Sequence, residues 1–99
     1  MLKLKKKFMP IVSVITPAYN SEKFISETIE SVLNQTYPHW EMIIVDDCST
    51  DRTTEIVQQY VEKDRRIKLI QLEENSGSAI ARNTAMDHAH GRYLAFLDS

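Results

Sequence analysis

The chain has 99 residues, of which 42% are hydrophobic and 26% are charged, as is typical of a folded globular domain and not of a disordered segment. This length corresponds to about one small domain with one hydrophobic core. The formal net charge of −2 is too close to neutral for a nucleic-acid-binding protein, and the single cysteine excludes a framework of internal disulfides.

The first nine residues form a basic tail, with lysines at Lys3, Lys5, Lys6 and Lys7. We interpret the tail as solvated, and contact with an anionic membrane surface is the alternative. No apolar stretch approaches the roughly 20 residues of a membrane-spanning helix, and nothing directs export. These features predict a cytoplasmic protein, with a peripheral position at the inner face of the membrane as the alternative.

The first expected strand covers residues 11–16 and stops at Pro17, because proline donates no hydrogen bond to a central ladder. Asn20 or Ser21 then offers an N-cap for a helix that ends near residues 35–36. Apolar residues recur on one face of this helix, at Ile25, Ile29, Val32 and Leu33. The pattern predicts a strand followed by an amphipathic helix.

The second strand is expected over residues 40–45, and its Met-Ile-Ile-Val stretch predicts burial on both faces. Thr50 or Asp51 then caps a second helix. The inner face of that helix consists of Ile56, Val57, Tyr60 and Val61. A shorter strand over residues 67–72 is expected nearer a sheet edge. The basic residues around its start read as a solvated turn: Arg65, Arg66 and Lys68.

An alanine-rich third helix is expected over residues 78–88, with Gly91 at its C-terminal cap, and a fourth, buried strand over residues 93–97. Strands and helices therefore alternate along the chain. With right-handed crossovers, this order predicts an α/β fold, a three-layer sandwich with a mainly parallel sheet. No linker or repeat interrupts residues 1–99, which we expect to form a single unit.

Ligands bind outside the carboxyl ends of the strands in such sheets, where the strand order reverses. Three groups follow the first, second and fourth strands: Pro17, Ala18 and Tyr19; Asp46 and Asp47; and Asp98. If the first strand lies between the second and fourth, spacings of about 4.8 Å bring these groups into one acidic crevice. Aspartates at strand ends also cap helices and form turns, which is the structural alternative.

The chain has only two glycines, so it has neither a G-x-G-x-x-G motif nor a Walker A loop. An anionic ligand in this crevice would need a positive charge between it and the carboxylates. Mg²⁺ or Mn²⁺ would provide one, because both prefer carboxylate and water oxygens, and an arginine is the alternative.

Five segments, in order, resemble family 2 glycosyltransferases, the inverting enzymes with a GT-A fold. They are residues 12–20 (VSVITPAYN), 31–38 (SVLNQTYP), 44–53 (IVDDCSTDRT), 75–83 (NSG followed by ARN) and 91–98 (GRYLAFLD). The usual glycine of the Asp-Asp-x-Ser loop is Cys48 here, a difference expected to change the shape of the loop more than its chemistry.

The resemblance implies a nucleotide-sugar donor, UDP-sugar in particular, and a saccharide or lipid-linked acceptor, as in polysaccharide biosynthesis. Pro17 and Tyr19 would border the nucleobase. Asp47 would accept the imino N–H of uracil, and Arg82 would donate toward the base or its carbonyl. For Arg82 the alternative is a surface salt bridge, and for Asp46 ligand contact and capping of its own loop both stay open.

Asp98 matches the first aspartate of the family's D-x-D motif, near the ribose and diphosphate, and would be a partial ligand of Mn²⁺ or Mg²⁺. The principal metal ligand would follow Ser99, and the general base would lie farther along. The resemblance therefore implies that residues 1–99 carry donor binding only, with no catalytic residue and no transfer by this piece alone. The fourth strand, left without cover, is expected to expose apolar surface and to self-associate.

Two other functions stay open. One is a non-catalytic nucleotide-binding or interaction module. The other is a response-regulator-like phosphoacceptor domain, which would need an acceptor aspartate after the middle strand. The third strand here ends instead at Leu72, Glu73 and Glu74.

Overall fold

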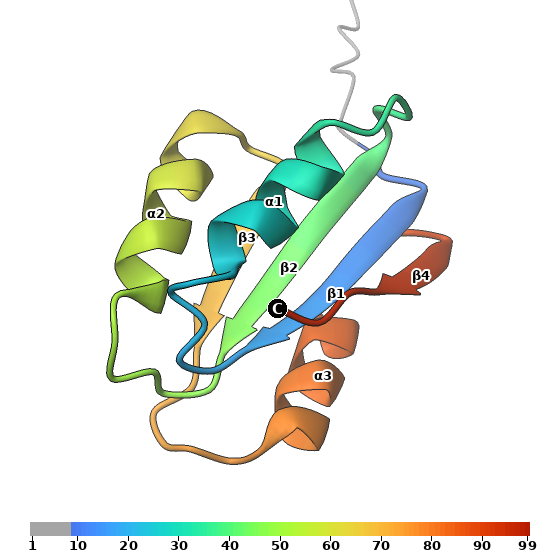
Figure 1. The fold of residues 1–99 in the computed structure, drawn as a ribbon. Coiled ribbons are helices and arrows are strands. Elements are labelled where there is room, and N and C mark those ends of the chain that lie inside the picture. The colour runs from blue at the N-terminus through green and yellow to red at the C-terminus, as the bar shows by residue number, and fades with distance from the viewer. Residues whose placement is uncertain (1–8) are drawn as a thin grey trace, which may run out of the picture.

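The computed structural model describes residues 9–99, so the basic run at positions 3–7 lies outside the described residues. Strands and helices alternate as predicted (Figure 1). Their bounds are β1 (Val12–Ala18), α1 (Ile25–Leu33), β2 (Trp40–Asp46), α2 (Thr53–Lys63), β3 (Ile67–Gln71), α3 (Ser78–Asp87) and β4 (Tyr93–Phe96). Within residues 9–99, none of the helices combines the length and apolar character needed to cross a membrane.

The four strands form one parallel sheet in the order β3-β2-β1-β4. The first strand therefore lies between the second and fourth, as the candidate site requires, and the third lies at an edge, as predicted. The strand order reverses at β1. Response-regulator-like sheets place the first strand between the second and third, in the order 2-1-3-4-5, so the strand order excludes that alternative.

The helices cover both faces of the sheet, which confirms the three-layer α/β prediction (Figure 1). On one face, α1 and α2 pack through Ile29 and Val57 against Val14 and Ile44. On the other face, the small residues of α3 pack closely on the central strands. The cluster there consists of Ile15, Ile43, Val45, Ala81 and Ala85. All seven residues of β2 are buried, which confirms the burial predicted for its Met-Ile-Ile-Val stretch and adds the buried carboxylates of Glu41 and Asp46.

The strand β1 continues through Pro17, so the predicted stop at this residue is wrong. The carbonyl of Pro17 accepts a hydrogen bond from Ser99 Oγ, and that of Ile15 accepts one from Leu97 N. Both residues therefore turn their backbone polar groups toward β4. Pairing with β4 ends at Phe96, opposite Ile15. The nitrogen of Pro17 consequently lies beyond the last paired residue, where the ladder needs no donor.

Both early helices begin later than predicted. Neither Asn20 nor Ser21 is the N-cap of α1, which starts at Ile25 after a turn. Asn20 has a φ of 47°, and its side chain bonds to a neighbouring loop instead of to the helix. The helix α2 starts at Thr53, and the amide of Thr53 donates to Asp51 Oδ1 at 2.9 Å. Asp51 thus lies outside the helix and provides a hydrogen-bond acceptor for the first amide of the helix.

Gly91 does not cap α3, whose C-cap is His88. The amide of Gly91 donates to Ser13 Oγ at 2.8 Å, and a Cβ at Gly91 would lie 2.7 Å from Ser13 N. The glycine therefore allows the connection between α3 and β4 to lie directly against β1.

The strand β4 is exposed at all four positions, so the prediction of a buried strand is wrong for the described chain. Its large apolar side chains are open to solvent: Tyr93 is 61% exposed, Leu94 44% and Phe96 56%. The predicted exposure of apolar surface on this strand is thus present in the structure.

Candidate functional site

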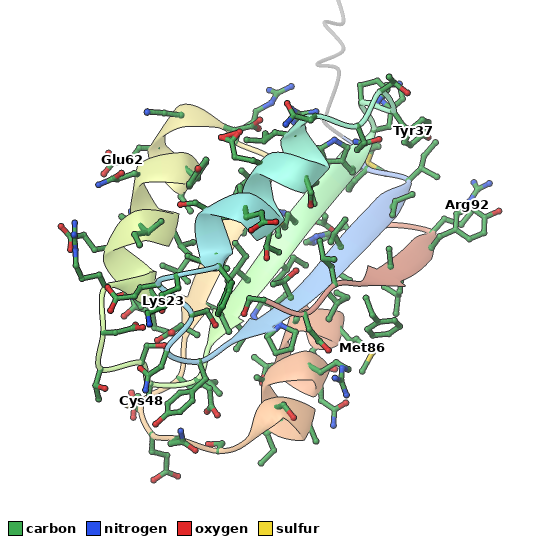
Figure 2. All side chains as sticks on the ribbon, in the orientation of Figure 1. Lys23, Tyr37, Cys48, Glu62, Met86 and Arg92 are labelled. Carbon is green, nitrogen blue, oxygen red and sulfur yellow. The ribbon has the colours of Figure 1, made fainter. Side chains whose placement is uncertain are left out.

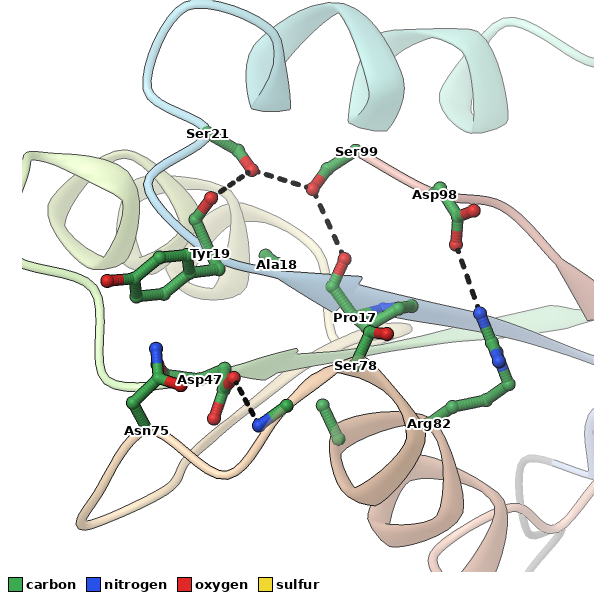
Figure 3. Close-up of a pocket in the computed structure, with 12 residues that line it drawn as sticks. Pro17, Ala18, Tyr19, Ser21, Asp47, Asn75, Ser78, Arg82, Asp98 and Ser99 are labelled. Carbon is green, nitrogen blue, oxygen red and sulfur yellow. Dashed lines mark hydrogen bonds and ion pairs between the residues drawn. The ribbon is translucent and has the colours of Figure 1, made fainter.

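A pocket of about 390 Å³ opens at the carboxyl end of β1, where the strand order reverses (Figure 3). This volume lies within the range of roughly 300–1,000 Å³ that is typical of small-molecule sites. The lining comes from the ends of β1, β2 and β4 and from the start of α3. It consists of Pro17, Ala18, Tyr19, Ser21, Asp47, Asn75, Gly77, Ser78, Ala81, Arg82, Asp98 and Ser99.

The structure brings together most of the residues predicted from the sequence. Those that line the pocket are Pro17, Ala18, Tyr19, Asp47, Arg82 and Asp98. Asp46 does not line it, because its carboxylate accepts hydrogen bonds from the amide and hydroxyl of Ser49. Of the two interpretations left open for Asp46, the structure shows the capping of its own loop.

The carboxylate of Asp47 lies between the pocket and the start of α3. Its Oδ1 accepts from Ser76 N at 2.7 Å and its Oδ2 from Gly77 N at 2.9 Å. These amides lie at the helix N-terminus, where the backbone dipole favours negative charge. An ionised carboxylate has about four lone-pair sites, so Asp47 keeps acceptor capacity toward the pocket.

Tyr19 presents its ring at the rim of the pocket, with 49% of its surface exposed. Its loop is fastened to the loop after β2. Asn20 N donates to Ser49 Oγ at 2.9 Å, and Thr50 N donates to Asn20 Oδ1 at 2.8 Å. Because asparagine tolerates the left-handed backbone needed here, the chain can turn sharply after Tyr19 and hold it over the pocket.

Arg82 and Asp98 pair with each other at one end of the pocket, away from Tyr19 and Asp47 (Figure 3). Arg82 Nη2 lies 3.8 Å from Asp98 Oδ1, and both side chains are open to water. Such an exposed ion pair contributes only about 0–1 kcal/mol, so a bound ligand can replace either partner at small cost. A salt bridge was the alternative interpretation of Arg82. The structure shows this salt bridge, and its partner is Asp98, which is itself a predicted site residue.

Several other residues of the pocket were given no role from the sequence, although one segment of the family resemblance, residues 75–83, contains most of them. These residues are Ser21, Asn75, Gly77, Ser78, Ala81 and Ser99. Ser99 has a visible role, because its hydroxyl donates to Pro17 O at 3.2 Å and lies 2.8 Å from Ser21 Oγ. These contacts hold the segment after β4 against the end of β1.

Within residues 9–99, no group of three or more His, Cys, Asp or Glu side chains could by itself hold a metal ion. The pocket offers the single exposed carboxylate of Asp98. Mg²⁺ is commonly bound by one or two carboxylates together with substrate phosphates and water, so Asp98 fits one place in such a ligand set.

Residues 13–99 match the sequence model of glycosyl transferase family 2. The chain is 63% identical over 90 residues to the putative teichuronic acid biosynthesis glycosyltransferase TuaG of Bacillus subtilis, covering 91% of this chain and 36% of TuaG. It is 51% identical over 89 residues to WfgD of Escherichia coli, a UDP-Glc:alpha-D-GlcNAc-diphosphoundecaprenol beta-1,3-glucosyltransferase, covering 90% of this chain and 34% of WfgD. The chain thus spans about a third of the length of these relatives.

Solved structures show the same fold. Staphylococcus aureus TarS 1–349 in complex with UDP superposes with a TM-score of 0.84 at 46% identity, over 90% of this chain and 27% of TarS. The mannosyltransferase PcManGT from Pyrobaculum calidifontis, in complex with GDP-Man and Mn²⁺, gives a TM-score of 0.83 at 35% identity, over 92% of this chain and 28% of PcManGT. With its parallel sheet, its pocket at the strand ends and the family match over residues 13–99, the chain belongs to glycosyl transferase family 2 and has the GT-A fold of these relatives.

Proposed function

We propose that this chain is the donor-binding part of an inverting glycosyltransferase that transfers a sugar from UDP-sugar to a hydroxyl acceptor. One observation carries the proposal: Tyr19, Asp47 and Arg82 come from three separate segments and line one pocket at the switch point of the sheet. In the proposed arrangement, Pro17, Ala18 and Tyr19 border the base, and Asp47 reads its edge.

Asp47 supplies the base specificity in this proposal. A carboxylate acceptor suits a base with a ring N–H, which uracil and guanine have and cytosine and adenine lack. TarS in complex with UDP and PcManGT in complex with GDP-Man both contain a base of the first kind. UDP is the better choice here because TarS is the more similar of the two and the name of WfgD specifies UDP-Glc.

The diphosphate would lie toward Arg82 and Asp98. Arg82 supplies a positive charge for the phosphates once its weak pairing with Asp98 is exchanged for the ligand. We propose Asp98 as one ligand of Mn²⁺ or Mg²⁺, which would neutralise the charge of the departing diphosphate. The other metal ligands and the general base are expected from residues after Ser99.

The acceptor and the cellular location follow from the relatives and are proposals for this chain. The name of WfgD specifies a diphosphoundecaprenol acceptor, and that of TuaG specifies teichuronic acid biosynthesis. We infer a saccharide or lipid-linked acceptor in polysaccharide biosynthesis. A lipid-linked acceptor would place the protein in the cytoplasm at the inner face of the membrane. The exposed apolar strand β4 further suggests that the 99-residue chain self-associates.

Titration of the chain with UDP, GDP, CDP and ADP by calorimetry, with and without Mn²⁺, tests the proposal. A hydrogen bond to a charged acceptor contributes about 1.5–3 kcal/mol, so UDP, which can donate one to Asp47, is expected to bind about 12- to 150-fold more tightly than CDP. Asp47→Asn should abolish this preference, because an amide is able to donate to the ring nitrogen of cytosine. Equal affinities for UDP and CDP in the unmodified chain would contradict the role of Asp47.

Glu74→Gln is the matched control for Asp47→Asn. It removes one negative charge from an exposed residue of the loop before α3, outside the pocket lining. If the preference for UDP reflects a specific hydrogen bond and not the overall charge of the rim, this control leaves the preference unchanged.

A further inference from the structure

A charged cluster lies at the end of the sheet opposite the pocket. Glu41 of β2 is fully buried, and its carboxylate is contacted from three directions. Ser13 Oγ of β1 donates to Oε2 at 2.5 Å, and Lys68 Nζ of β3 donates to Oε1 at 2.7 Å. The amide of His90, in the connection between α3 and β4, donates to Oε2 at 2.6 Å.

Both carboxylate oxygens of Glu41 have hydrogen-bond donors in spite of their burial. Burial alone would raise the pKa of Glu41, but the hydrogen bonds from Lys68, Ser13 and His90 outweigh that effect and lower the pKa to about 2. The His90 ring also faces this carboxylate, with Nδ1 3.5 Å from Oε1. Glu41 is therefore a charged acceptor at neutral pH, and an apolar residue of similar size would fill its space without its bonds.

The connection held by this carboxylate joins the two elements that bear the charged walls of the pocket. It leaves α3 after Asp87 and enters β4 at Tyr93. Arg82 lies on α3, and Asp98 follows β4. The same Ser13 hydroxyl that donates to Glu41 also accepts from Gly91 N at 2.8 Å. Two consecutive amides of the connection, those of His90 and Gly91, are thus fixed to β2 and β1.

This end of the sheet lies away from the pocket. Figure 2 shows Tyr37 and Arg92 near the amino ends of the strands, whereas Cys48 lies at the carboxyl ends beside the pocket loops. Glu41 pairs with Ser13, near the amino end of β1, while Pro17 and Ala18 at the other end line the pocket. Glu41 therefore does not touch a ligand in the pocket, and any effect that it has on binding is indirect.

We propose that Glu41 is a positioning residue for nucleotide binding. By fixing His90 directly and Gly91 through Ser13, it sets where α3 ends and β4 begins, and so sets the spacing between Arg82 and Asp98 in the pocket. The inference rests on the proposed function, because it requires the diphosphate of the nucleotide to bind at these two side chains.

The experiment compares Glu41→Leu with Ile29→Ala, a control that removes fully buried volume from the opposite face of the sheet. Two readouts are taken at a temperature where circular dichroism shows every variant to be folded. One is the Kd for UDP. The other is the distance distribution by pulsed electron paramagnetic resonance between spin labels at Ile80 of α3 and Leu94 of β4, both exposed, in a Cys48→Gly background.

Glu41→Leu is expected to raise the Kd for UDP about 2- to 30-fold, in the range of coupling between distant residues. It should also broaden or shift the label distances, while Ile29→Ala lowers stability and changes neither readout. Glu41→Gln keeps an acceptor for His90 N, so its Kd for UDP and its label distances should lie close to those of the unmodified chain. Ser13→Ala, a smaller change to the same cluster, should shift both readouts in the direction of Glu41→Leu, and it replaces that variant if Glu41→Leu does not fold.

Two outcomes separate this inference from the proposed function. Unchanged label distances and an unchanged Kd in folded Glu41→Leu and Ser13→Ala would overturn the positioning role, even if UDP binds the unmodified chain. Absence of UDP binding in the unmodified chain would overturn the proposed function, and with it the claim that the spacing serves a nucleotide. In that case the label distances would still show whether Glu41 controls the spacing between α3 and β4.

Discussion

Cys48 adopts a φ of 63°, in the left-handed region that costs an L-residue about 1–2 kcal/mol. Glycine has no such penalty but loses about 0.5–1 kcal/mol more backbone entropy on folding. We expect Cys48→Gly to raise the free energy of unfolding by about 0.5–1 kcal/mol, measured by urea denaturation. Cys48→Ala keeps the strain and removes only a weak contact from Sγ to Glu73 O, so a similar gain in that variant would contradict the explanation.

The residues of the pocket show how far chemistry can be predicted from the sequence. Asp46 and Asp47 are neighbours of identical type, and only the structure reveals that one bonds to Ser49 and the other to the start of α3. Capping and ligand binding use the same carboxylate oxygens, so sequence reasoning left both interpretations open. The expected effect of Cys48 on the shape of the loop stays a prediction, and the structure shows only that Cys48 adopts a positive φ, which glycine adopts without strain.

Glu41 and Lys68 were missed for a different reason. Lysine at the start of a short strand is usually solvated, and Lys68 does remain 42% exposed along its side chain. Its charged end nevertheless reaches a carboxylate that the neighbouring strand buries completely. The pairing of β2 with β3 brings them together, and strand pairing cannot be read from either segment alone.

The connection between α3 and β4 depends on the absence of a side chain at Gly91. A Cβ there would lie 2.7 Å from Ser13 N and 2.9 Å from the carbonyl carbon of Val12, and both atoms belong to a central strand. Gly91→Ala should therefore lower the free energy of unfolding by about 1–3 kcal/mol. Thermal denaturation measures the loss, and Arg92→Ala, at the next and exposed position, should change stability by less than about 0.5 kcal/mol. Equal stability of the two variants would show that β4 can move away from β1 freely.

At the scale of elements, the order and type of all seven agree with the sequence, because apolar runs and helical periodicity record burial directly. The boundaries that differ depend on partners. Pro17 continues β1 only because β4 stops pairing at Phe96. α1 begins at Ile25 because Asn20 turns its side chain to Thr50 of another loop. Local patterns do not contain these contacts.

For the whole molecule, the exposed face of β4 sets the association behaviour. Tyr93, Leu94 and Phe96 present a contiguous apolar strand at the edge of the described sheet, the arrangement that favours pairing between chains. We expect the 99-residue chain to form dimers or larger species with increasing concentration, measured by light scattering after size exclusion. Phe96→Lys should shift it toward the monomer.

Ile80→Lys is the control for this prediction, because Ile80 is 51% exposed but lies on α3, away from β4. The same change of polarity there should leave the association unchanged. A chain that stays monomeric at all concentrations before any substitution would contradict the prediction. The exposure of this strand also marks a limit of the sequence, since a run such as Tyr-Leu-Ala-Phe indicates burial without showing which surface will cover it.

Pro17, on the inner strand β1, lines the pocket without a backbone amide hydrogen. Pairing of β1 with β4 ends at Ile15, so any other residue at position 17 would present an amide hydrogen that has no partner in this ladder. Pro17 places ring carbons there instead. A ligand on this surface meets no backbone donor at that point, so the hydrogen bonds that select it must come from the surrounding side chains and amides.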